Sequence, residues 1–370
     1  MKKKILVFSD EIPPAGGGSG VIAKKITDNY IEYGHKVTLL SGDEANYNSL
    51  NLKHIRVKRI TLLWIFNYIY SIFIKVRLNV FDSIIINDQM SAYISGLLFT
   101  KKQLSKCTIV IHGRDSNYFF NTISLKHKLF FFKRFYKRSL LYSNKIVAVS
   151  NWTKNEYLKY IPKDIKPSII DKISWHFAGI DKNDLAGGEA CKLSLNLDLK
   201  NKGVLISVGR LVKMKGYFEM LEIFSKNIKT NKDIVWLIVG DGPDKATLEN
   251  KVSELGLNKN IKFLGKVPRN TLSELYLLAD TFWLYSKTEA YGLVFLEAAS
   301  YNLPSLGPCE GGVKEAIVEN ITGFYMDEKI DLSNALKQCI ELKKTNKPSL
   351  YADSVSTKKF SSYLHINIHE

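Results

Sequence analysis

Short apolar runs alternate with helix-length segments along the whole chain. The runs are rich in β-branched residues and end in turn or polar residues, as strands do in parallel sheets that are covered on both faces. They lie at 4–10, 36–42, 83–88, 107–113 and 145–150 in the first half, and at 203–210, 234–242, 261–265 and 280–286 in the second. Segments of helical length, such as 19–33 and 63–79, lie between them. This pattern predicts the α/β fold class, with two doubly wound halves.

The polar, glycine-containing stretch 181–203 separates the two halves and is the natural linker. A chain of 370 residues is also too long for one ordinary core. We therefore predict a first domain at 1–183, a second at 184–355, and a C-terminal helix at 356–370 that packs back on the first domain. Ligands of open α/β sheets bind at the carboxyl ends of the strands, so the candidate chemistry is sought there.

No apolar run reaches the roughly 18–20 residues that a membrane-spanning helix needs. The nearest candidate, 60–74, is shorter and contains Asn67 and Ser71, so we expect a buried or interfacial helix. The N-terminal apolar run stops at Phe8 and meets Asp10, which fits a first strand better than a secretion signal. The sequence thus predicts a cytoplasmic protein.

The net charge of +17 is concentrated in the first half of the chain. Residues 1–185 contain 29 Lys and Arg against 14 Asp and Glu, a net charge of +15, which leaves +2 for the remainder. A half this basic is expected to face something anionic, which could be nucleic acid, a lipid surface or an acidic substrate.

The densest basic cluster is the segment 125–141, LKHKLFFFKRFYKRSLL. When this segment is drawn as one helix, an apolar face carries Leu125, Leu129, Phe132, Tyr136 and Leu140. The opposite face carries Lys126, Lys133, Arg134 and Lys137. An ordinary packed surface helix has this pattern, and so does an interfacial helix that touches anionic lipid. Nucleic acid is a third alternative, although no RNA- or DNA-binding motif accompanies the charge.

The sequence offers no pattern typical of a metal site. Its four cysteines are scattered, with no Cys-x-x-Cys and no histidine at metal-ligand spacing, so we expect reduced thiols. No Asp-x-Asp occurs either, so the usual carboxylate pair for a diphosphate-bound Mg²⁺ or Mn²⁺ is missing. We expect neither a metal nor a cofactor.

Two strand-to-helix turns have residues that suit phosphate. The first, 13–25, is rich in glycine, and its backbone N–H groups could approach a phosphate at the start of a helix. Its spacing is neither GxGxxG nor that of a P-loop, and a flexible turn would have the same composition. In the second, 207–221, Arg210 and Lys215 flank the turn, and an arginine fork with a lysine charge would suit a diphosphate. A solvated basic loop is the alternative.

The stretch 288–300, TEAYGLVFLEAAS, places two glutamates around the expected start of a helix near Val294. Glu289 lies just before this helix and Glu297 lies within its first turns. The N–H groups that would form an anion site are those of Tyr291, Gly292, Leu293 and Val294. Either acid alone fits helix-dipole electrostatics, worth about 0.3–1 kcal/mol. Acid–base chemistry and metal binding are the alternatives for the pair.

Taken together, these motifs resemble the retaining glycosyltransferases of family 4, which have the GT-B fold of two Rossmann-like domains facing across a cleft. The segment GRLVKMKG is similar to the phosphate motif of that family, and EAYGLVFLE to its Glu-x7-Glu motif. LPSLG and GGVKEAIVENITGF follow at the spacing that the family shows. In the first half, GGSGVIAKKITDNYIEYGHKV, IHGRD and VAVSNWTKNEYL also match, so the resemblance covers most of the chain.

The resemblance implies roles for positions in the second half. Glu297 would hold the ribose hydroxyls of a nucleotide, and Glu289 would bind hydroxyls of the transferred sugar. Gly209, Arg210 and Lys215, with the amides at the helix start, would stabilise the negative charge that grows on the departing diphosphate.

Further roles follow from the same resemblance. The backbone at Lys266 and Val267 would read the base. Gly17 and Gly18 would approach the diphosphate, and His112 would face the reacting sugar and the acceptor. The expected catalytic residues are His112, Arg210, Lys215 and Glu289.

The function expected is transfer of a hexose, with retention and front-face attack, from a nucleotide-diphosphate sugar. The acceptor would be a lipid-linked or cell-surface polysaccharide or lipopolysaccharide precursor at the inner face of the cytoplasmic membrane, with no nucleic acid involved. Arg210 and Lys215 would take the place of a metal ion. A nucleotide-sugar epimerase of the same fold is a second hypothesis, and a basic membrane- or nucleic-acid-binding protein on an α/β scaffold is a third. The Glu-x7-Glu spacing and the Arg210–Lys215 pair favour the transferase.

Overall fold

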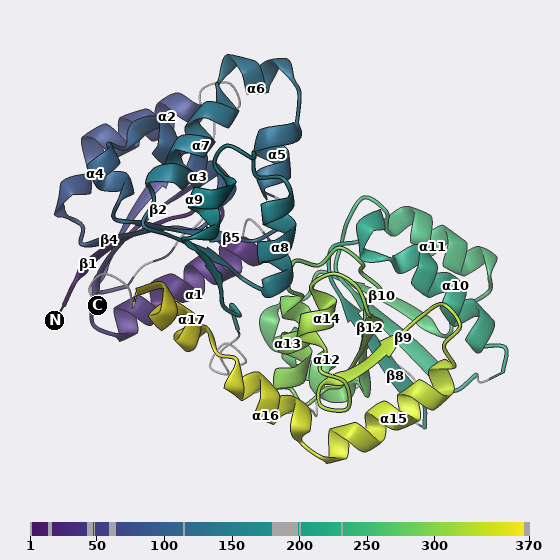
Figure 1. Cartoon of the computed structure of the whole chain (residues 1–370). Helices are drawn as coiled ribbons and strands as arrows, with labels where there is room; N and C mark the ends of the chain where they lie inside the picture. Colours follow the sequence, from purple (N-terminus) through teal and green to yellow (C-terminus); the bar gives the residue numbers. More distant parts are fainter. Residues whose placement is uncertain are drawn as a thin grey trace. The chain divides into compact units, whose positions relative to one another are not determined.

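The chain forms two compact units, each built around one parallel sheet (Figure 1). Unit 1 comprises Met1–Ala178 with Thr357–Glu370, and unit 2 comprises Gly179–Ser356. The computed structural model describes residues 2–13, 17–42, 47, 49–58, 64–113, 115–179, 199, 201–230 and 232–365. The predicted boundary between residues 183 and 184 lies outside the described residues.

The sheet of unit 1 has seven parallel strands in the order β3-β2-β1-β4-β5-β6-β7. They are β1 (Lys4–Phe8), β2 (Lys36–Gly42), β3 (Leu52–Val57), β4 (Ser83–Ile86), β5 (Cys107–Ile111), β6 (Lys145–Ala148) and β7 (Ile173–Trp175). The five predicted runs of this half all contain strands, which confirms the doubly wound parallel organisation. The apolar pattern does not predict the edge strands, because β3 alternates exposed polar with buried residues and β7 has only three residues.

Helices cover both faces of this sheet. They are α1 (Gly18–Glu32), α2 (Trp64–Tyr70), the π-helical turn η1 (Ser71–Lys75), the 3-10 turn η2 (Leu78–Val80), α3 (Gln89–Leu98), α4 (Lys101–Leu104), α5 (Asp115–Asn121), α6 (Leu125–Leu129), α7 (Phe132–Tyr142), α8 (Asn151–Lys159), α9 (Lys166–Ile170) and α17 (Thr357–His365). Buried residues of α2, α3 and α7 share one core cluster with Leu6, Phe8 and Leu40 of the sheet. Helix α1 packs on β1 and β2 from the other face, where α17 joins it (Figure 1).

The prediction of a single helix over 125–141 is wrong. The chain forms α6 and α7 with a break at Phe131, whose φ of 50° is left-handed. Phe132 is buried next to Tyr93, with ring centroids 4.5 Å apart, and this anchoring competes with a continuous helix. The expected apolar face is therefore split, because Leu125 and Leu129 are 82% and 66% exposed.

The C-terminal helix α17 packs against α1 within unit 1. The Asn29 amide Nδ2 donates to Ser361 Oγ at 3.0 Å, and the Tyr30 hydroxyl donates to the Ser361 carbonyl oxygen at 3.1 Å. Phe360 and Leu364 are buried beside them. Unit 1 is thus completed by residues from the far end of the chain.

Unit 2 has six parallel strands in the order β10-β9-β8-β11-β12-β13. They are β8 (Gly203–Val208), β9 (Ile234–Val239), β10 (Ile261–Gly265), β11 (Thr281–Trp283), β12 (Ser305–Pro308) and β13 (Gly323–Met326). Its helices are the 3-10 turn η4 (Lys213–Lys215), α10 (Tyr217–Asn227), α11 (Lys245–Glu254), α12 (Arg269–Leu278), α13 (Leu293–Ser300), α14 (Val313–Ala316), α15 (Leu332–Lys344) and α16 (Lys347–Ser354). The core contains Trp236 and Trp283, whose ring centroids are 4.8 Å apart.

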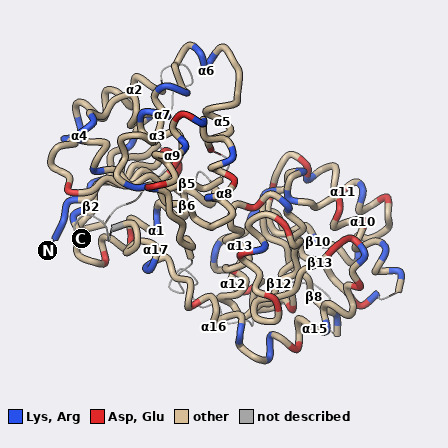
Figure 2. The backbone as a smooth tube through the Cα atoms, viewed as in Figure 1, with Lys and Arg blue, Asp and Glu red and all other residues tan. Residues whose placement is uncertain are grey.

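The basic character of unit 1 is visible along the backbone (Figure 2). Lys and Arg outnumber Asp and Glu over unit 1, whereas the two signs mix over unit 2. None of the described helices combines the length and the apolar character that a membrane crossing requires.

Candidate active site

The strongest candidate site in unit 2 joins Lys215 and Glu289 at the carboxyl ends of the neighbouring strands β8 and β11. Lys215 Nζ forms an ion pair with Glu289 Oε1, and these side chains are only 24% and 13% exposed. Gly216, with φ of 75°, lets the turn approach closely, since a Cβ there would lie 2.2 Å from the Tyr285 carbonyl oxygen. Local backbone geometry therefore brings together two residues that are 74 positions apart.

Arg210 and Gly209 lie on the same turn after β8. The Gly209 N–H donates to the Val239 carbonyl oxygen at 3.0 Å, while Arg210 is exposed and makes no ion pair with any described residue. The hydroxyl of Tyr217 is close to Gly209, because a Cβ built on Gly209 would lie 3.3 Å from it. This hydroxyl is buried and has no hydrogen-bond partner among the described residues. Burial, with the nearby Glu289 charge, raises the pKa of Tyr217. The sequence pattern does not mark this hydroxyl, because Tyr217 occupies an ordinary apolar position of α10.

Helix α13 begins at Leu293, one residue before the predicted start. Gly292 has φ of 79°, and a Cβ there would lie 2.8 Å from the Phe295 ring. The first hydrogen bond of the helix runs from the Phe295 N–H to the Gly292 carbonyl oxygen at 2.9 Å. The N–H groups of Leu293 and Val294 precede that bond, as the first N–H groups of any α-helix do, and can bind an anion. Tyr291, before the helix, is buried.

Glu297 is held by two residues of α12 that the sequence does not predict. Arg269 Nη2 lies 3.1 Å from Glu297 Oε1, and the Tyr276 hydroxyl donates to Glu297 Oε2 at 3.3 Å. Burial and the Glu297 charge raise the pKa of Tyr276 well above its usual value. The structure thus places Glu297 in its own cluster, and no described contact joins it to the Lys215–Glu289 pair.

Lys266 and Val267 lie in the turn between β10 and α12. The Lys266 side chain is exposed and Val267 is half-buried. They directly precede α12, so the residues expected to contact the base are close in the chain to Arg269 and Tyr276, which hold Glu297.

In unit 1, Gly17 and Gly18 stand at the start of α1. The Gly17 N–H donates to Glu11 Oε2 at 3.3 Å, and Ser19 Oγ donates to the same oxygen at 3.2 Å. A carboxylate of the chain itself therefore occupies the anion position of this helix. A phosphate that approached these glycines would compete with Glu11 for the same donors.

His112 follows β5 and contacts Asn87, which follows the neighbouring strand β4. Asn87 Nδ2 donates to Ser9 Oγ at 3.2 Å and to the Ser19 carbonyl oxygen at 2.8 Å, so its Oδ1 faces His112 Nε2 at 3.2 Å. Nε2 then carries the proton, which leaves Nδ1 as an acceptor. Burial lowers the pKa of His112 to about 4. His112 is thus a neutral hydrogen-bonding group at neutral pH.

Three further polar residues of unit 1 form a network that the sequence does not predict. The backbone N–H of Asp10 donates to Asp88 Oδ2 at 2.6 Å, and the Tyr68 hydroxyl donates to Asp10 Oδ1. Burial and the Asp10 charge raise the pKa of Asp88 to about 6. Because Asp10 follows β1 and Asp88 follows β4, this network lies at the same carboxyl edge of the sheet as His112.

The predicted basic face of the segment 125–141 is partly occupied. Lys126, Lys133 and Arg134 are exposed, whereas Lys137 forms an ion pair with Asp164. The exposed apolar side chains here are those of Leu125, Leu129 and Phe131, preceded by Ile123. The structure therefore leaves three of the four predicted basic residues accessible, next to apolar side chains.

Over the residues that the structure describes, no group of three or more His, Cys, Asp or Glu side chains is arranged to hold a metal ion. Cys107 and Cys339 are buried and Cys309 is exposed, all three as free thiols, and Cys191 lies outside the described residues.

Two family models match most of the chain. The model of "Glycosyltransferase Family 4" matches residues 16–171, and that of "Glycosyl transferases group 1" matches residues 196–352. The chain is a glycosyltransferase of family 4. The matched ranges hold Gly17, Gly18 and His112 on one side, and the Lys215–Glu289 and Glu297 clusters on the other.

Relatives of this family 4 glycosyltransferase include enzymes with different acceptors. N-acetyl-alpha-D-glucosaminyl L-malate synthase of Bacillus anthracis is 25% identical over 90% of this chain and 86% of its own length. The phosphatidylinositol N-acetylglucosaminyltransferase GPI3 subunit of Saccharomyces cerevisiae is 28% identical over 58% of this chain and 47% of its own length. The structure of HepE from Anabaena with UDP-glucose matches with a TM-score of 0.75 at 16% identity, over 98% of each chain, and confirms the GT-B fold.

Proposed function

We propose that this glycosyltransferase moves a hexose, with retention and without a metal ion, from a nucleotide-diphosphate sugar to a lipid-linked or cell-surface glycan precursor. The observation that carries the proposal is the half-buried Lys215–Glu289 ion pair, which lies where the two segments after β8 and β11 offer positive charge and free N–H groups. UDP-glucose in the structurally similar HepE supports a donor of this class.

In this proposal the positively charged side chains of the candidate site in unit 2 bind the diphosphate. Arg210 and Lys215, with the N–H groups of Leu293 and Val294, stabilise the charge of the leaving group. Such a set supplies by fixed side chains and amides the stabilisation that a metal ion supplies elsewhere. Glu289, once its lysine turns to the diphosphate, accepts hydrogen bonds from hydroxyls of the sugar.

The remaining proposed contacts concern the nucleotide and the acceptor. Glu297 accepts the two ribose hydroxyls, while Arg269 and Tyr276 fix its carboxylate. The backbone at Lys266 and Val267 contacts the base. In unit 1, Gly17 and Gly18 approach the diphosphate, and His112 offers a neutral imidazole to sugar or acceptor hydroxyls.

An anionic acceptor explains why unit 1 is so basic. The names of two relatives contain L-malate and phosphatidylinositol, which both carry negative charge. For this chain we propose a lipid-borne acceptor, reached from the inner face of the cytoplasmic membrane. Lys126, Lys133 and Arg134 contribute to that contact.

The decisive experiment is a screen of nucleotide sugars for binding and hydrolysis, with Glu297→Ala beside the wild type. Loss of the ribose acceptor should weaken binding of the preferred nucleotide at least tenfold in isothermal titration, as for loss of a hydrogen bond to a charged group. Glu254→Ala, an exposed acid of α11 in the same unit, is the matched control and should bind normally. Equal affinity of both variants would overturn the ribose role. A product whose anomeric configuration is inverted would overturn retention.

A further inference from the structure

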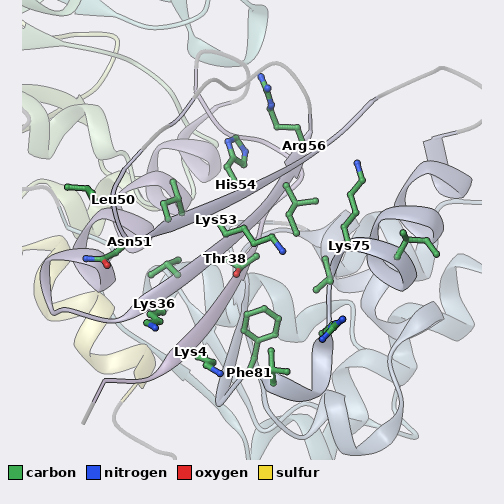
Figure 3. Close-up of a pocket in the computed structure, with 17 residues that line it drawn as sticks. Lys4, Lys36, Thr38, Leu50, Asn51, Lys53, His54, Arg56, Lys75 and Phe81 are labelled. Carbon is green, nitrogen blue, oxygen red and sulfur yellow. The ribbon is translucent and has the colours of Figure 1, made fainter.

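Two adjoining features of unit 1 take no part in the site described above. One is a groove of about 1120 Å³ that runs along β2 and β3 (Figure 3). Its second wall is made by η1 and the residues up to Phe81. The other is an exposed apolar stripe on α2 and η1.

The groove is lined by basic side chains and by no acidic one. Its Lys and Arg residues are Lys4, Lys36, Lys53, Arg56, Lys75 and Arg77. All six are exposed, and none of them forms an ion pair with a residue that the structure describes. Asp82, which follows the groove-lining Phe81, accepts a hydrogen bond from the backbone N–H of Lys4 at 2.7 Å. The groove is therefore a concentrated positive surface.

Strand register places these charges side by side. Lys4 of β1 lies opposite Lys36 of β2, and Thr38 of β2 lies opposite Lys53 of β3. Neighbouring strands are about 4.8 Å apart, and like charges that face each other across strands repel. The three lysines come from one face of the sheet, as Figure 3 shows. A bound anion would relieve this repulsion.

The groove is distinct from the candidate active site. Lys4 and Lys36 are the first residues of their strands, whereas His112 and Asp88 follow the carboxyl ends of theirs. The part of the groove lined by these two lysines thus lies at the amino ends of the strands, at the opposite edge of the sheet from that site, and the groove extends along β3 as far as Arg56.

The apolar stripe continues the groove. Phe66, Tyr70, Phe73 and Ile74 have helical spacing and are 60%, 58%, 67% and 67% exposed. Ile65, Tyr68 and Ile72 of the same segment are buried in the core. Ile74 belongs to both surfaces, because it also lines the groove. Lys75 Nζ lies 5.8 Å from the centroid of the Tyr70 ring, so charge and apolar surface meet directly.

One kind of binding partner matches both the basic groove and the apolar stripe. A second copy of the chain would bring the same six cations against themselves. A soluble polyanion would neutralise the groove but would leave the stripe in water. An anionic bilayer supplies phosphate groups for the groove and an apolar layer for the aromatic side chains.

We propose that unit 1 binds the phosphate headgroups of anionic lipids in this groove, while Phe66, Tyr70, Phe73 and Ile74 enter the boundary between headgroups and acyl chains. The proposal of this second membrane-binding surface rests on the proposed function only because that function assigns a lipid-borne acceptor. Binding to vesicles is measured without donor or acceptor, so its failure would leave the transferase proposal intact.

The test uses the full chain and vesicles of phosphatidylglycerol mixed with phosphatidylcholine, against phosphatidylcholine alone. Each basic residue near an anionic surface contributes about fivefold to binding, so Lys36→Glu with Lys53→Glu and Arg77→Glu should weaken it more than ~100-fold. The matched control reverses three exposed lysines of unit 2, Lys232, Lys259 and Lys337, with the same change in net charge, and should bind almost as the wild type does. Lys53→Gln, a single exposed substitution, gives a second variant that preserves the fold.

The apolar stripe is tested separately. Phe73→Ser with Ile74→Ser should weaken vesicle binding at least tenfold, whereas Leu255→Ser with Leu350→Ser, exposed positions of unit 2, should not. Hydrogen exchange of the wild type should slow over residues 64–77 when vesicles are added. The proposal is overturned if the stripe and groove variants bind vesicles as the wild type does. The proposal is equally overturned if inorganic polyphosphate slows hydrogen exchange in the residues that line the groove and vesicles do not.

Discussion

At the scale of single residues, the charge on Lys215 is the feature most directly tied to the proposed chemistry. Lys215→Ala should lower turnover by roughly 10²–10³-fold, the usual effect of removing one preorganised charge donor. Lys213→Ala is the matched control, because Lys213 belongs to the same 3-10 turn but is exposed. Steady-state kinetics of both variants measures the difference. Addition of EDTA to the wild type should change its rate little, and a strict need for Mg²⁺ would contradict the role given to Lys215.

His112 offers a second prediction at this scale. The pKa of the half-buried imidazole, about 4, lies below the ordinary value near 6.5, so the folded state disfavours the proton. Its contribution to stability is therefore complete above about pH 6.5 and is lost as the pH falls towards 4. The proton resonance of the His112 ring, assigned with His112→Asn, should not shift between about pH 8 and 5. A titration near pH 6.5 would show instead that the ring is solvated.

At the scale of elements, the break between α6 and α7 combines strain with exposure. Phe131 has a left-handed backbone, which costs a residue with a side chain about 1–2 kcal/mol, and its ring is 58% exposed. Phe131→Gly should therefore keep or raise the free energy of unfolding, since it removes this strain at the cost of a more flexible unfolded chain. The same substitution should weaken binding to phosphatidylglycerol vesicles, because an apolar ring next to Lys133 and Arg134 is lost.

The two readouts of that variant separate structure from function. Chemical denaturation reports the stability and sedimentation with vesicles reports the binding. If Phe131→Gly unfolds more easily than the wild type, the left-handed backbone is not the source of strain. If it binds vesicles normally, the segment around α6 has no part in a membrane contact.

The elements also show what sequence alone can and cannot predict. The strand ends are predictable because the apolar runs at 203–210 and 280–286 are continuous. The first run ends at Arg210, and the segments after the two runs carry Lys215 and Gly292. The break at Phe131 is not predictable, because it depends on ring packing between Phe132 and residues distant in sequence. Arg269 and Tyr276 escape notice for the same reason, since only the fold brings α12 to Glu297. For the stripe on α2 and η1, the sequence predicts an apolar segment. It does not predict which side of that segment is exposed, because packing against the core decides this.

At the scale of the whole molecule, α17 makes the stability of unit 1 depend on the end of the chain. Removal of residues 357–370 takes away the buried Phe360 and Leu364, each worth about 1.5–3 kcal/mol, and leaves Tyr30 and Asn29 without Ser361. We expect unit 1 to lose about 5 kcal/mol and to melt first. Hydrogen exchange should quicken in α1 and stay unchanged in α15. Removal of 366–370 alone is the control, and a truncated chain with unchanged exchange in α1 would contradict the stabilising role of α17.

The same arrangement has a consequence for how the protein is made. Residues Thr357–Glu370 belong to unit 1, so the ribosome must synthesise all of unit 2 before α1 can meet its partner helix. At ~5–20 residues per second, unit 2 alone takes roughly ten to forty seconds to emerge. During that interval unit 2 can fold, because it is formed by one continuous segment of the chain. The nascent unit 1 still exposes the surface of α1 that Phe360 and Leu364 later cover. The unit that is synthesised first is therefore the one that finishes folding last, and its uncovered helix is the surface that chaperones would encounter on the growing chain.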